Sequence, residues 1–313
     1  MIAPEGPATH AQWYEPIEPI AAWLRHHGLE RGSHVLIFSE TRREWFQADL
    51  AIIAAGGITV PSYPNLPPGQ VERIISHCRP THAFVSRAAH LEDLLRAPSA
   101  AGCLRTVVLM EGNPVAGSPE SDARSAAVGI ERSGPLAPSH QNGLSGFPRV
   151  VSWEQARAEG AALEAELREV DGLLRALDLD DPATLIFTSG TSGEMKGVLL
   201  THGNLLYSAR VSAELLEVNP ADVYLSFLPL NHVLERVVHL SMLHAGAVIH
   251  YSQGLDQLEQ EFRRVRPTIV VGVPRLYEKI LLEIEQKARA RGPRGLLLLR
   301  LAERAARRSG RLA

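Results

Sequence analysis

Cysteine and aromatic residues are scarce in this chain: among 313 residues there are two cysteines, and 5% are Phe, Trp or Tyr. Cys78 and Cys103 stand in neither a metal-binding nor a redox spacing, so we expect no disulfide framework and a reducing compartment. The first residues lack a basic head followed by an apolar core, which predicts that no signal peptide is present. The longest apolar stretch, residues 50–61, is far too short to span a bilayer. We therefore expect a cytoplasmic protein.

Charge is unevenly distributed along the chain. The net charge is −3, but residues 286–313 contain nine Lys or Arg and one acid, so this tail carries +8 and the remainder carries −11. Basic tails bind nucleic acid or anionic lipid in other proteins. Because the tail contains no aromatic residue, we expect no nucleic-acid partner. We expect a solvated helix or a surface that packs on further parts of the protein, and peripheral membrane contact stays open as an alternative.

Apolar residues make up 45% and charged residues 21% of the chain, as in ordinary globular proteins. Short β-branched runs alternate with stretches of helical periodicity, and this alternation predicts doubly wound, mainly parallel α/β sheets with flanking helices. The runs that predict strands are residues 34–39, 58–60, 83–86, 106–110, 150–152, 184–187, 223–227, 247–251 and 268–271. The stretches that predict helices are residues 17–24, 43–55, 71–78, 153–177, 204–216, a stretch after Leu230, 255–264 and 274–291, with Pro293 and Gly295 as a break before a last helix.

Composition divides the chain into three parts. We expect a first α/β subdomain over residues 1–110 and a second over residues 149–313. Between them, residues 111–148 are rich in Gly, Pro, Ser and Ala and show little periodicity, which predicts a flexible surface insertion.

One segment carries a distinctive chemistry. After the predicted strand at 184–187, residues 188–197 read TSGTSGEMKG. Glycines let backbone N–H groups converge on an oxyanion, hydroxyls add donors, and Lys196 supplies positive charge, which together predict a loop that holds a polyphosphate. The loop is not of the Walker type, because the chain contains no Gly-Lys-Ser or Gly-Lys-Thr, and no G-x-G-x-x-G opens a helix here.

The loop resembles the signature of the adenylate-forming (AMP-forming) acyl-CoA synthetase superfamily, which is close to T-S-G-T-T-G-x-P-K-G. Ser192 stands in place of the second threonine and Met195 in place of the proline. Residues 225–236, LSFLPLNHVLER, are similar to the family's L-P-L-x-H segment, and the Glu-Arg at their end is typical of the long-chain fatty acid–CoA ligase branch. Further similar segments are residues 39–45 (SETRREW), 55–64 (AGGITVPSYP), 266–268 (RPT) and 272–276 (GVPRL).

The resemblance implies a two-step ligation. A fatty carboxylate attacks the α-phosphate of ATP, and the thiol of coenzyme A then displaces AMP from the acyl-adenylate. The residues that the resemblance assigns to the β- and γ-phosphates, with Mg²⁺ sharing the charge, are Thr188, Ser189, Gly190, Thr191, Ser192, Gly193 and Lys196. It places His232 beside the fatty acid and the adenylate, so Lys196 and His232 are the expected catalytic residues. Without the resemblance, a histidine that follows a strand is more often structural, and that alternative stays open.

The resemblance covers residues 16–294, and it implies only the amino-terminal part of such a ligase. Family members also carry Y-G-x-T-E and T-G-D segments and a carboxy-terminal lid domain, whereas this sequence contains no Tyr-Gly and no Thr-Gly-Asp. We expect the chain to be inactive by itself, because acceleration requires that both reactants be fixed. Two alternatives are a noncatalytic nucleotide- or acyl-binding fragment and one half of a split ligase completed by a second chain. No histidine stands in a metal-ligand spacing, so we expect no metal site formed by these residues.

Overall fold

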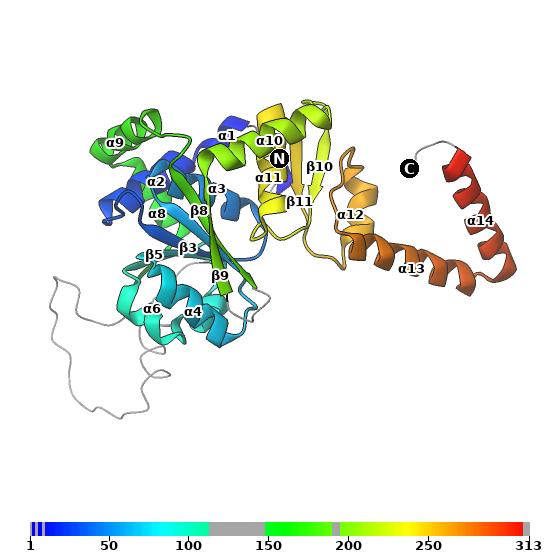
Figure 1. Cartoon of the computed structure of the whole chain (residues 1–313), viewed down its shortest axis with the longest axis horizontal. Helices are drawn as coiled ribbons and strands as arrows, with labels where there is room; N and C mark the ends of the chain where they lie inside the picture. Colours follow the sequence, from blue (N-terminus) through cyan, green and yellow to red (C-terminus); the bar gives the residue numbers. More distant parts are fainter. Residues whose placement is uncertain (1, 4–5, 8–9, 113–147, 190–194, 309–313) are drawn as a thin grey trace, which may run out of the picture. The chain divides into compact units, whose positions relative to one another are not determined.

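The computed structural model describes residues 2–3, 6–7, 10–112, 148–189 and 195–308, and it divides into two units, Met1–Ile269 and Val270–Ala313. The helices of the first unit are α1 (His10–Tyr14), α2 (Ile17–His26), α3 (Arg43–Ala54), α4 (Pro68–Cys78), α5 (Ala88–Leu95), α6 (Pro98–Cys103), α8 (Trp153–Ala161), α9 (Glu164–Arg175), α10 (His202–Leu215), α11 (Val233–Ala245) and α12 (Leu258–Val265). Its strands are β1 (Ile2–Ala3), β2 (Gly6–Pro7), β3 (His34–Phe38), β4 (Ile58–Ser62), β5 (His82–Val85), β6 (Thr106–Leu109), β7 (Arg149–Ser152), β8 (Pro182–Ser189), β9 (Met195–Thr201), β10 (Val223–Ser226) and β11 (Val248–Tyr251) (Figure 1).

Two sheets organise the first unit. The larger sheet has the strand order β7-β6-β5-β3-β4-β8-β9, in which only the β8–β9 pair is antiparallel. The smaller sheet has the order β10-β11-β1-β2, in which β10, β11 and β1 run parallel. The predicted mainly parallel α/β architecture is therefore confirmed. The carboxyl ends of the parallel strands gather on one edge of each sheet, and the connections that follow them position the site described below.

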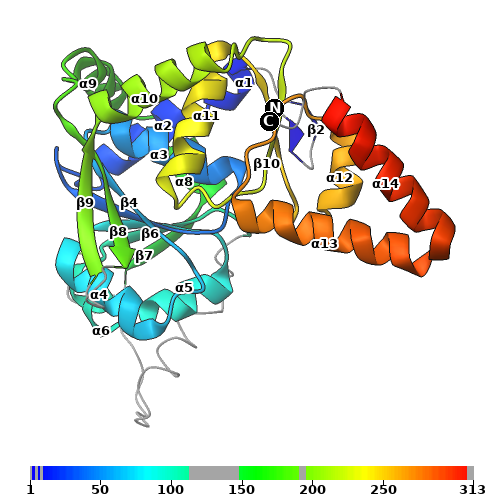
Figure 2. The ribbon, with the colours of Figure 1, turned by 45° about the vertical axis from the view of Figure 1, so that its right-hand side comes forward.

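Helices cover both faces of the larger sheet (Figures 1 and 2). On one face, the buried side chains of α4, α5 and α6 share a core with β3, β4, β5 and β6. On the other, α2 packs against α3, α8 and α9, and three tryptophans there, Trp13, Trp23 and Trp45, are completely buried. The approach of α2 to α8 depends on Gly160, because a Cβ atom there would lie 1.9 Å from the carbonyl oxygen of Pro19. Burial of this apolar surface is the main force that holds the layers together.

The predicted strands are present to within two residues, with one exception. Residues 268–271 form no strand, and only Ile269 makes an isolated bridge to Tyr224. The structure also adds β9, which no periodicity predicted. The middle of β9 is exposed on both faces, so its side chains show no alternation, and the strand exists because it pairs with β8 along its whole length.

The predicted helices differ from the structure at several points. The single helix expected over residues 153–177 is two helices, α8 and α9, because Leu163 has the non-helical angles φ −93° and ψ 73°. The short helices α1, α5 and α6 were not predicted. Pro293 and Gly295 do not separate the last two helices. They lie inside the next helix, where a proline in the first turn lacks an N–H that would have no intrahelical partner anyway. Residues 113–147, most of the predicted insertion, lie outside the described residues, and the predicted division into subdomains stays a prediction.

The second unit contains two helices among its described residues, α13 (Pro274–Ala290) and α14 (Gly292–Arg308). Gly292, between them, has φ +69°, a left-handed conformation that glycine adopts without strain. Gly295 then faces α13, because a Cβ atom there would lie 2.2 Å from the carbonyl oxygen of Ala288. Across residues 10–308, apart from the two undescribed stretches, no helix has the length and hydropathy that a bilayer crossing requires.

Candidate functional site

The two strands that flank the predicted phosphate loop form an antiparallel hairpin. Thr188 at the end of β8 is paired with Lys196 at the start of β9, and the Thr188 hydroxyl donates to the Lys196 carbonyl at 3.4 Å. Ser189 pairs with Met195. The other predicted loop residues, Gly190, Thr191, Ser192 and Gly193, lie outside the described residues. The structure thus places the first two and the last of the predicted phosphate-binding residues on neighbouring strand ends.

Side-chain alternation separates the hairpin into two faces. Thr188 and Lys196 are opposite each other, and both are exposed. On the other face, Phe187 and Met195 line an open hollow of about 520 Å³ together with Arg73, Ser76 and His77 of α4. The ring of His77 meets that of Phe187 edge-on at 5.5 Å. The exposed Lys196 side chain therefore lies on the opposite face of the hairpin from α4, and it does not line that hollow.

A cleft of similar volume lies at the carboxyl ends of the parallel strands. It has a volume of about 510 Å³, and its lining comes from the segments that follow β3, β4 and β5 in one sheet and β10 and β11 in the other. The lining residues are Glu40, Thr41, Tyr63, Pro64, Asn65, Arg87, His90, Ser226, Phe227, Pro229, Asn231, Ser252, Gln253, Gly254 and Leu255. Ligands of open α/β sheets bind outside the carboxyl ends of the strands, so this cleft is the candidate substrate site.

His232 lies at the border of this cleft. It is exposed, it precedes the first turn of α11, and its ring is 5.3 Å from the ring of Tyr63, which lines the cleft. Burial raises the pKa of Tyr63 to about 12, so its hydroxyl stays protonated at neutral pH. The sequence pattern indicated His232 but not Tyr63, which directly follows β4 and lies three residues beyond the predicted strand 58–60.

The hydroxyl of Thr41, which follows β3, fixes the backbone of the loop before His232. The Thr41 side chain donates to the carbonyl of Leu228 at 2.9 Å and accepts from the amide of Leu230 at 2.8 Å. Thr41 follows β3, so the contact joins segments 187 and 189 residues apart. One side chain thereby satisfies two backbone groups of the loop.

Asn231 makes a second, deeper link between the same segments. Its amide nitrogen donates to the carbonyl of Ser39 at 3.0 Å, and its amide oxygen accepts from the Trp45 indole at 3.2 Å. Asn231 is buried, so these hydrogen bonds are protected from water. The neighbour of His232 is therefore anchored to the segment 39–45, one of the segments that resemble the family.

A buried carboxyl on α11 links this helix to β10, the strand before the loop that contains His232. Glu235, on the first turn of α11, is completely buried and accepts hydrogen bonds from the Tyr224 hydroxyl at 2.7 and 2.8 Å and from the Ser226 hydroxyl at 2.7 Å. Burial raises the pKa of Glu235 to about 7, although both hydroxyls work against that rise. Burial lowers the pKa of the neighbouring His239 to about 4. At neutral pH His239 is therefore uncharged, and the Glu235 carboxyl is only partly ionised.

The next residue, Arg236, ties α11 to α3 through a buried ion pair. Its Nε donates to Asp49 at 2.7 Å, a second guanidinium nitrogen also contacts that carboxylate, and the Thr59 hydroxyl donates to Asp49 at 2.7 Å. Both charged side chains are about 1% exposed. Burial raises the pKa of Asp49, and the adjacent guanidinium opposes that rise. The Glu-Arg sequence that follows the histidine segment is thus part of the interior framework behind the cleft.

Charged groups stand at the rim of the cleft. Arg87 donates to Glu40 at 2.8 Å, and His90, whose Nδ1 lies 2.6 Å from the Ser86 hydroxyl, is 3.5 Å from the same carboxylate. Burial alone would raise the pKa of Glu40, but the Ser86 hydroxyl and the two cationic neighbours hold it below its ordinary value. Sequence reasoning missed this group because its members follow different strands and form no motif.

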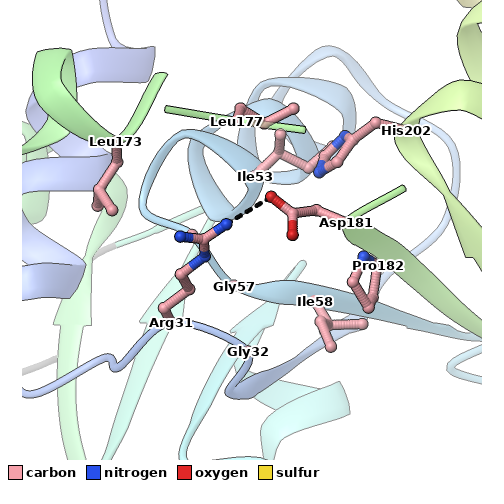
Figure 3. A pocket seen from close by; sticks show the side chains of 11 residues that line it. Arg31, Gly32, Ile53, Gly57, Ile58, Leu173, Leu177, Asp181, Pro182 and His202 are labelled. Atoms are coloured by element: carbon pink, nitrogen blue, oxygen red, sulfur yellow. Dashed lines mark hydrogen bonds and ion pairs between the residues drawn. The ribbon is translucent and has the colours of Figure 1, made fainter. Parts of the chain in front are cut away.

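A smaller pocket lies at the opposite edge of the larger sheet, at the amino ends of its strands (Figure 3). It has a volume of about 120 Å³ and is bordered by residues that precede β3, β4 and β8. Arg31 and Asp181 form an ion pair of 2.6 Å across its mouth, and His202 points toward them from the start of α10. The amino ends of the strands are not where α/β sheets bind their ligands, so the larger cleft remains the candidate site.

The chain matches a known family over nearly its whole length. The model described as AMP-binding enzyme matches residues 2–306. Long-chain-fatty-acid–CoA ligase FadD15 of Mycobacterium tuberculosis is 30% identical over 283 residues, which cover 90% of this chain and 41% of that protein. The peroxisomal long chain acyl-CoA synthetase 6 of Arabidopsis thaliana is 30% identical over 274 residues, 87% of this chain and 35% of that protein. The chain thus spans about two fifths of the length of the curated relatives it matches.

Solved structures share the fold at lower identity. The A-PCP didomain of carboxylic acid reductase from Segniliparus rugosus in complex with AMP matches with a TM-score of 0.72 at 19% identity, over 93% of this chain and 40% of that one. ATP-bound MatB from Rhodopseudomonas palustris matches with a TM-score of 0.60 at 20% identity, over 88% of this chain and 46% of that one. At these identities the likeness shows the fold alone, and it agrees with the α/β architecture described above.

Proposed function

The chain belongs to the AMP-binding enzyme family, and we propose that it supplies the phosphate- and acyl-binding part of a long-chain fatty acid–CoA ligase. In that reaction a fatty carboxylate attacks the α-phosphate of ATP and releases pyrophosphate, and the thiol of coenzyme A then displaces AMP from the acyl-adenylate. The observation that carries the proposal is the cleft at the carboxyl ends of both sheets, with His232 against the cleft-lining Tyr63. The 30% identity to long-chain ligases supports a long-chain acid as substrate.

The proposed phosphate site is the loop between β8 and β9. Its members are Thr188, Ser189, Gly190, Thr191, Ser192, Gly193 and Lys196, which hold the β- and γ-phosphates through backbone amides, hydroxyls and one ammonium group. Such a site accelerates phosphoryl chemistry mainly by positioning and by electrostatic stabilisation of the leaving group. Lys196, the positively charged member of this group, is exposed and so accessible to a phosphate.

The proposed acyl site is the cleft beside His232. Its volume of about 510 Å³ lies within the ordinary range of small-molecule sites. Thr41 and Asn231 fix the backbone of the loop before His232 by hydrogen bonds, so the histidine stands beside the cleft-lining Tyr63 on a supported backbone. Mg²⁺ and coenzyme A belong to the proposal through the family alone, since the described residues contain no group of three His, Cys, Asp or Glu that could hold a metal ion.

The second candidate function is binding without turnover. The sequence contains no Y-G-x-T-E or T-G-D segment, which the resemblance assigns to adenine, Mg²⁺ and ribose. A phosphate loop without those groups binds nucleotide weakly and leaves the α-phosphate unpositioned for attack. We therefore propose that this chain alone binds nucleotide or acyl groups with negligible turnover, and that a fuller chain or a second chain completes the ligase.

Two assays, nucleotide binding and ATP–pyrophosphate exchange, test the proposed phosphate site and distinguish an active ligase from a binding fragment. A fluorescent ATP analogue is titrated into the wild type, Lys196→Ala and the matched control Lys279→Ala, which removes an exposed lysine of α13. We expect Lys196→Ala to weaken binding at least about tenfold, since a charge-assisted contact to phosphate contributes ~1.5–3 kcal/mol. We expect Lys279→Ala to leave binding unchanged. Equal binding by all three proteins would refute the proposed phosphate site.

Fatty-acid-dependent ATP–pyrophosphate exchange then separates the ligase from the binding fragment. With this chain alone we expect no exchange above background for palmitate or hexanoate. Exchange that depends on the fatty acid and disappears in Lys196→Ala would show that the chain is active by itself and would overturn the second candidate.

A further inference from the structure

Helix α14 presents leucines and arginines together on one exposed side. We call this side the Leu–Arg face, and its members are Arg294, Leu297, Leu298, Arg300, Leu301 and Arg304, all of them exposed. With 3.6 residues per turn, these positions fall in two adjacent rows, 294–298–301 and 297–300–304. Gly295 lies on the opposite side of the helix, where it packs against Ala288 of α13. The Leu–Arg face is therefore the side that the partner helix leaves uncovered.

The leucines of this face are exposed to an unusual degree. Leu297, Leu298 and Leu301 are 59%, 64% and 51% exposed. Scattered exposed leucines are ordinary, but three on adjacent turns of one helix form a contiguous apolar strip. An occupant that covers this face must therefore offer an apolar layer.

The same occupant must also offer negative charge. Helix α14 carries five arginines against one acid, Glu303. A protein surface that buried this face would need a carboxylate at a fixed place for each arginine, because an unpaired buried guanidinium is costly. A lipid headgroup layer supplies mobile phosphates instead, and arginine side chains reach them while the leucines enter the acyl boundary.

Helix α13 provides an internal comparison. It also exposes large apolar residues, among them Leu281, Leu282 and Ile284. Its four cations are nearly balanced by three glutamates, and Glu285 pairs with Arg289 at 3.6 Å. Both helices thus expose apolar residues. Only α14 combines its exposed leucines with a large excess of positive charge.

We propose that the Leu–Arg face binds the surface of an anionic phospholipid bilayer, with α14 lying in the plane of the interface. At 17 residues the helix is about 25 Å long, which suits a helix that rests in the headgroup region. The binding needs no nucleotide and no acyl substrate, so it stands or falls independently of the proposed ligase function.

Vesicle partitioning tests the proposal. The full chain is sedimented with phosphatidylcholine vesicles and with vesicles that contain 30% phosphatidylglycerol, at low and high salt, without ATP or fatty acid. We expect binding to the anionic vesicles alone and loss of that binding at high salt, because counterions screen the arginines. For Arg300→Gln/Arg304→Gln we expect partitioning to fall about 25-fold, since each cation near an anionic surface contributes about fivefold.

Two further variants, each with a matched control, test the apolar strip and guard against misfolding. Leu298→Gln/Leu301→Gln is expected to reduce partitioning by at least about tenfold, while the matched pair Leu215→Gln/Leu216→Gln, exposed at the end of α10, leaves it unchanged. In Leu298→Trp the indole emission is expected to shift to the blue on anionic vesicles, and in Leu215→Trp to stay constant. The four native tryptophans are buried, so they contribute a constant background.

Three outcomes would overturn the proposal. The first is equal binding to neutral and anionic vesicles, and the second is binding that the α14 variants do not reduce. The third is a concentration-dependent dimer, seen by light scattering, that Leu298→Gln/Leu301→Gln dissociates, because it would assign the Leu–Arg face to a second copy of the chain.

Discussion

Replacing Glu235 with glutamine removes a titratable group from the protein interior while keeping its size. The carboxyl is completely buried and accepts hydrogen bonds from Tyr224 and Ser226, and the glutamine amide oxygen can accept from the same hydroxyls. The substitution therefore changes the proton balance of the folded state with little change in packing.

The sign of the pH dependence follows from the direction of the shift. The pKa of Glu235 is about 7 in the folded protein against an ordinary value of 4.5. The folded state thus binds the proton more tightly, and this contribution to stability is complete below pH 4.5 and is lost as the pH rises through 7. A difference of this size corresponds to about 3 kcal/mol of unfolding free energy.

His239 has the opposite effect in an overlapping range. Its pKa is about 4 in the folded protein against an ordinary value of 6.5, so its contribution is present above pH 6.5 and is lost as the pH falls toward 4. In the wild type the two groups oppose each other between about pH 4.5 and 6.5. Glu235→Gln leaves the His239 contribution uncompensated.

Urea unfolding followed by tryptophan fluorescence at pH 5 and pH 8 measures the difference. We expect the unfolding free energy of the wild type, relative to Glu235→Gln, to be about 2.5 kcal/mol smaller at pH 8 than at pH 5. Glu92→Gln, at an exposed position of α5, is the control and is expected to follow the wild type. Parallel pH profiles for the wild type and Glu235→Gln would refute the argument that burial raises this pKa.

Three other substitutions test the framework by the same unfolding measurement. Arg236→Met leaves the buried carboxylate of Asp49 without its partner and is expected to cost about 3–5 kcal/mol. Gly160→Ala places a Cβ atom 1.9 Å from the carbonyl oxygen of Pro19 and is expected to cost about 1–3 kcal/mol or more, because α2 and α8 must separate. Thr41→Val leaves one amide and one carbonyl of the His232 loop without a partner and is expected to cost about 1–3 kcal/mol.

Matched variants provide controls for two of these substitutions. Thr41→Ser keeps the hydroxyl and is expected to retain most of the stability that Thr41→Val loses. Gly172→Ala, on an exposed turn of α9 where a Cβ atom meets nothing within 4 Å, is expected to stabilise by about 0.5–1 kcal/mol. A cost for Gly172→Ala equal to that for Gly160→Ala would show that the close approach of α2 and α8 is not the cause. For Arg236→Met, an unchanged midpoint would contradict the role given to the ion pair.

Secondary structure was predictable where one face of an element is buried and its pattern is local. The parallel strands read as short β-branched runs, and all but residues 268–271 form strands. Helix α3 shows where this reasoning fails. The apolar residues Leu50 and Ile53 are only half-buried. The polar residues Gln47 and Asp49 are buried, because α3 is packed between other elements on several sides. A single apolar stripe cannot describe such a helix.

The site was predictable in part. The sequence selected the phosphate loop by its glycines, hydroxyls and lysine, and it selected His232 by resemblance. The structure describes Thr188 and Lys196 on paired strand ends and His232 beside the cleft, while the roles of these residues stay predictions. The residues that support the His232 loop, Thr41 and Asn231 among them, were not found, because polar side chains that bind backbone groups leave no periodic pattern in the sequence.

Sequence by itself determined the fold class, the family and the chemistry of the loop, because each rests on patterns within a few consecutive residues. Tertiary structure alone decided how the cleft is assembled, since Trp45 meets Asn231 across 186 residues and Thr41 meets the same loop across 187. It also decided the protonation of Glu235, because a pKa depends on burial and neighbours that no local pattern records. The uneven charge of the chain was visible in the sequence, but only the folded helices show that the arginines of α14 share an exposed face with its leucines.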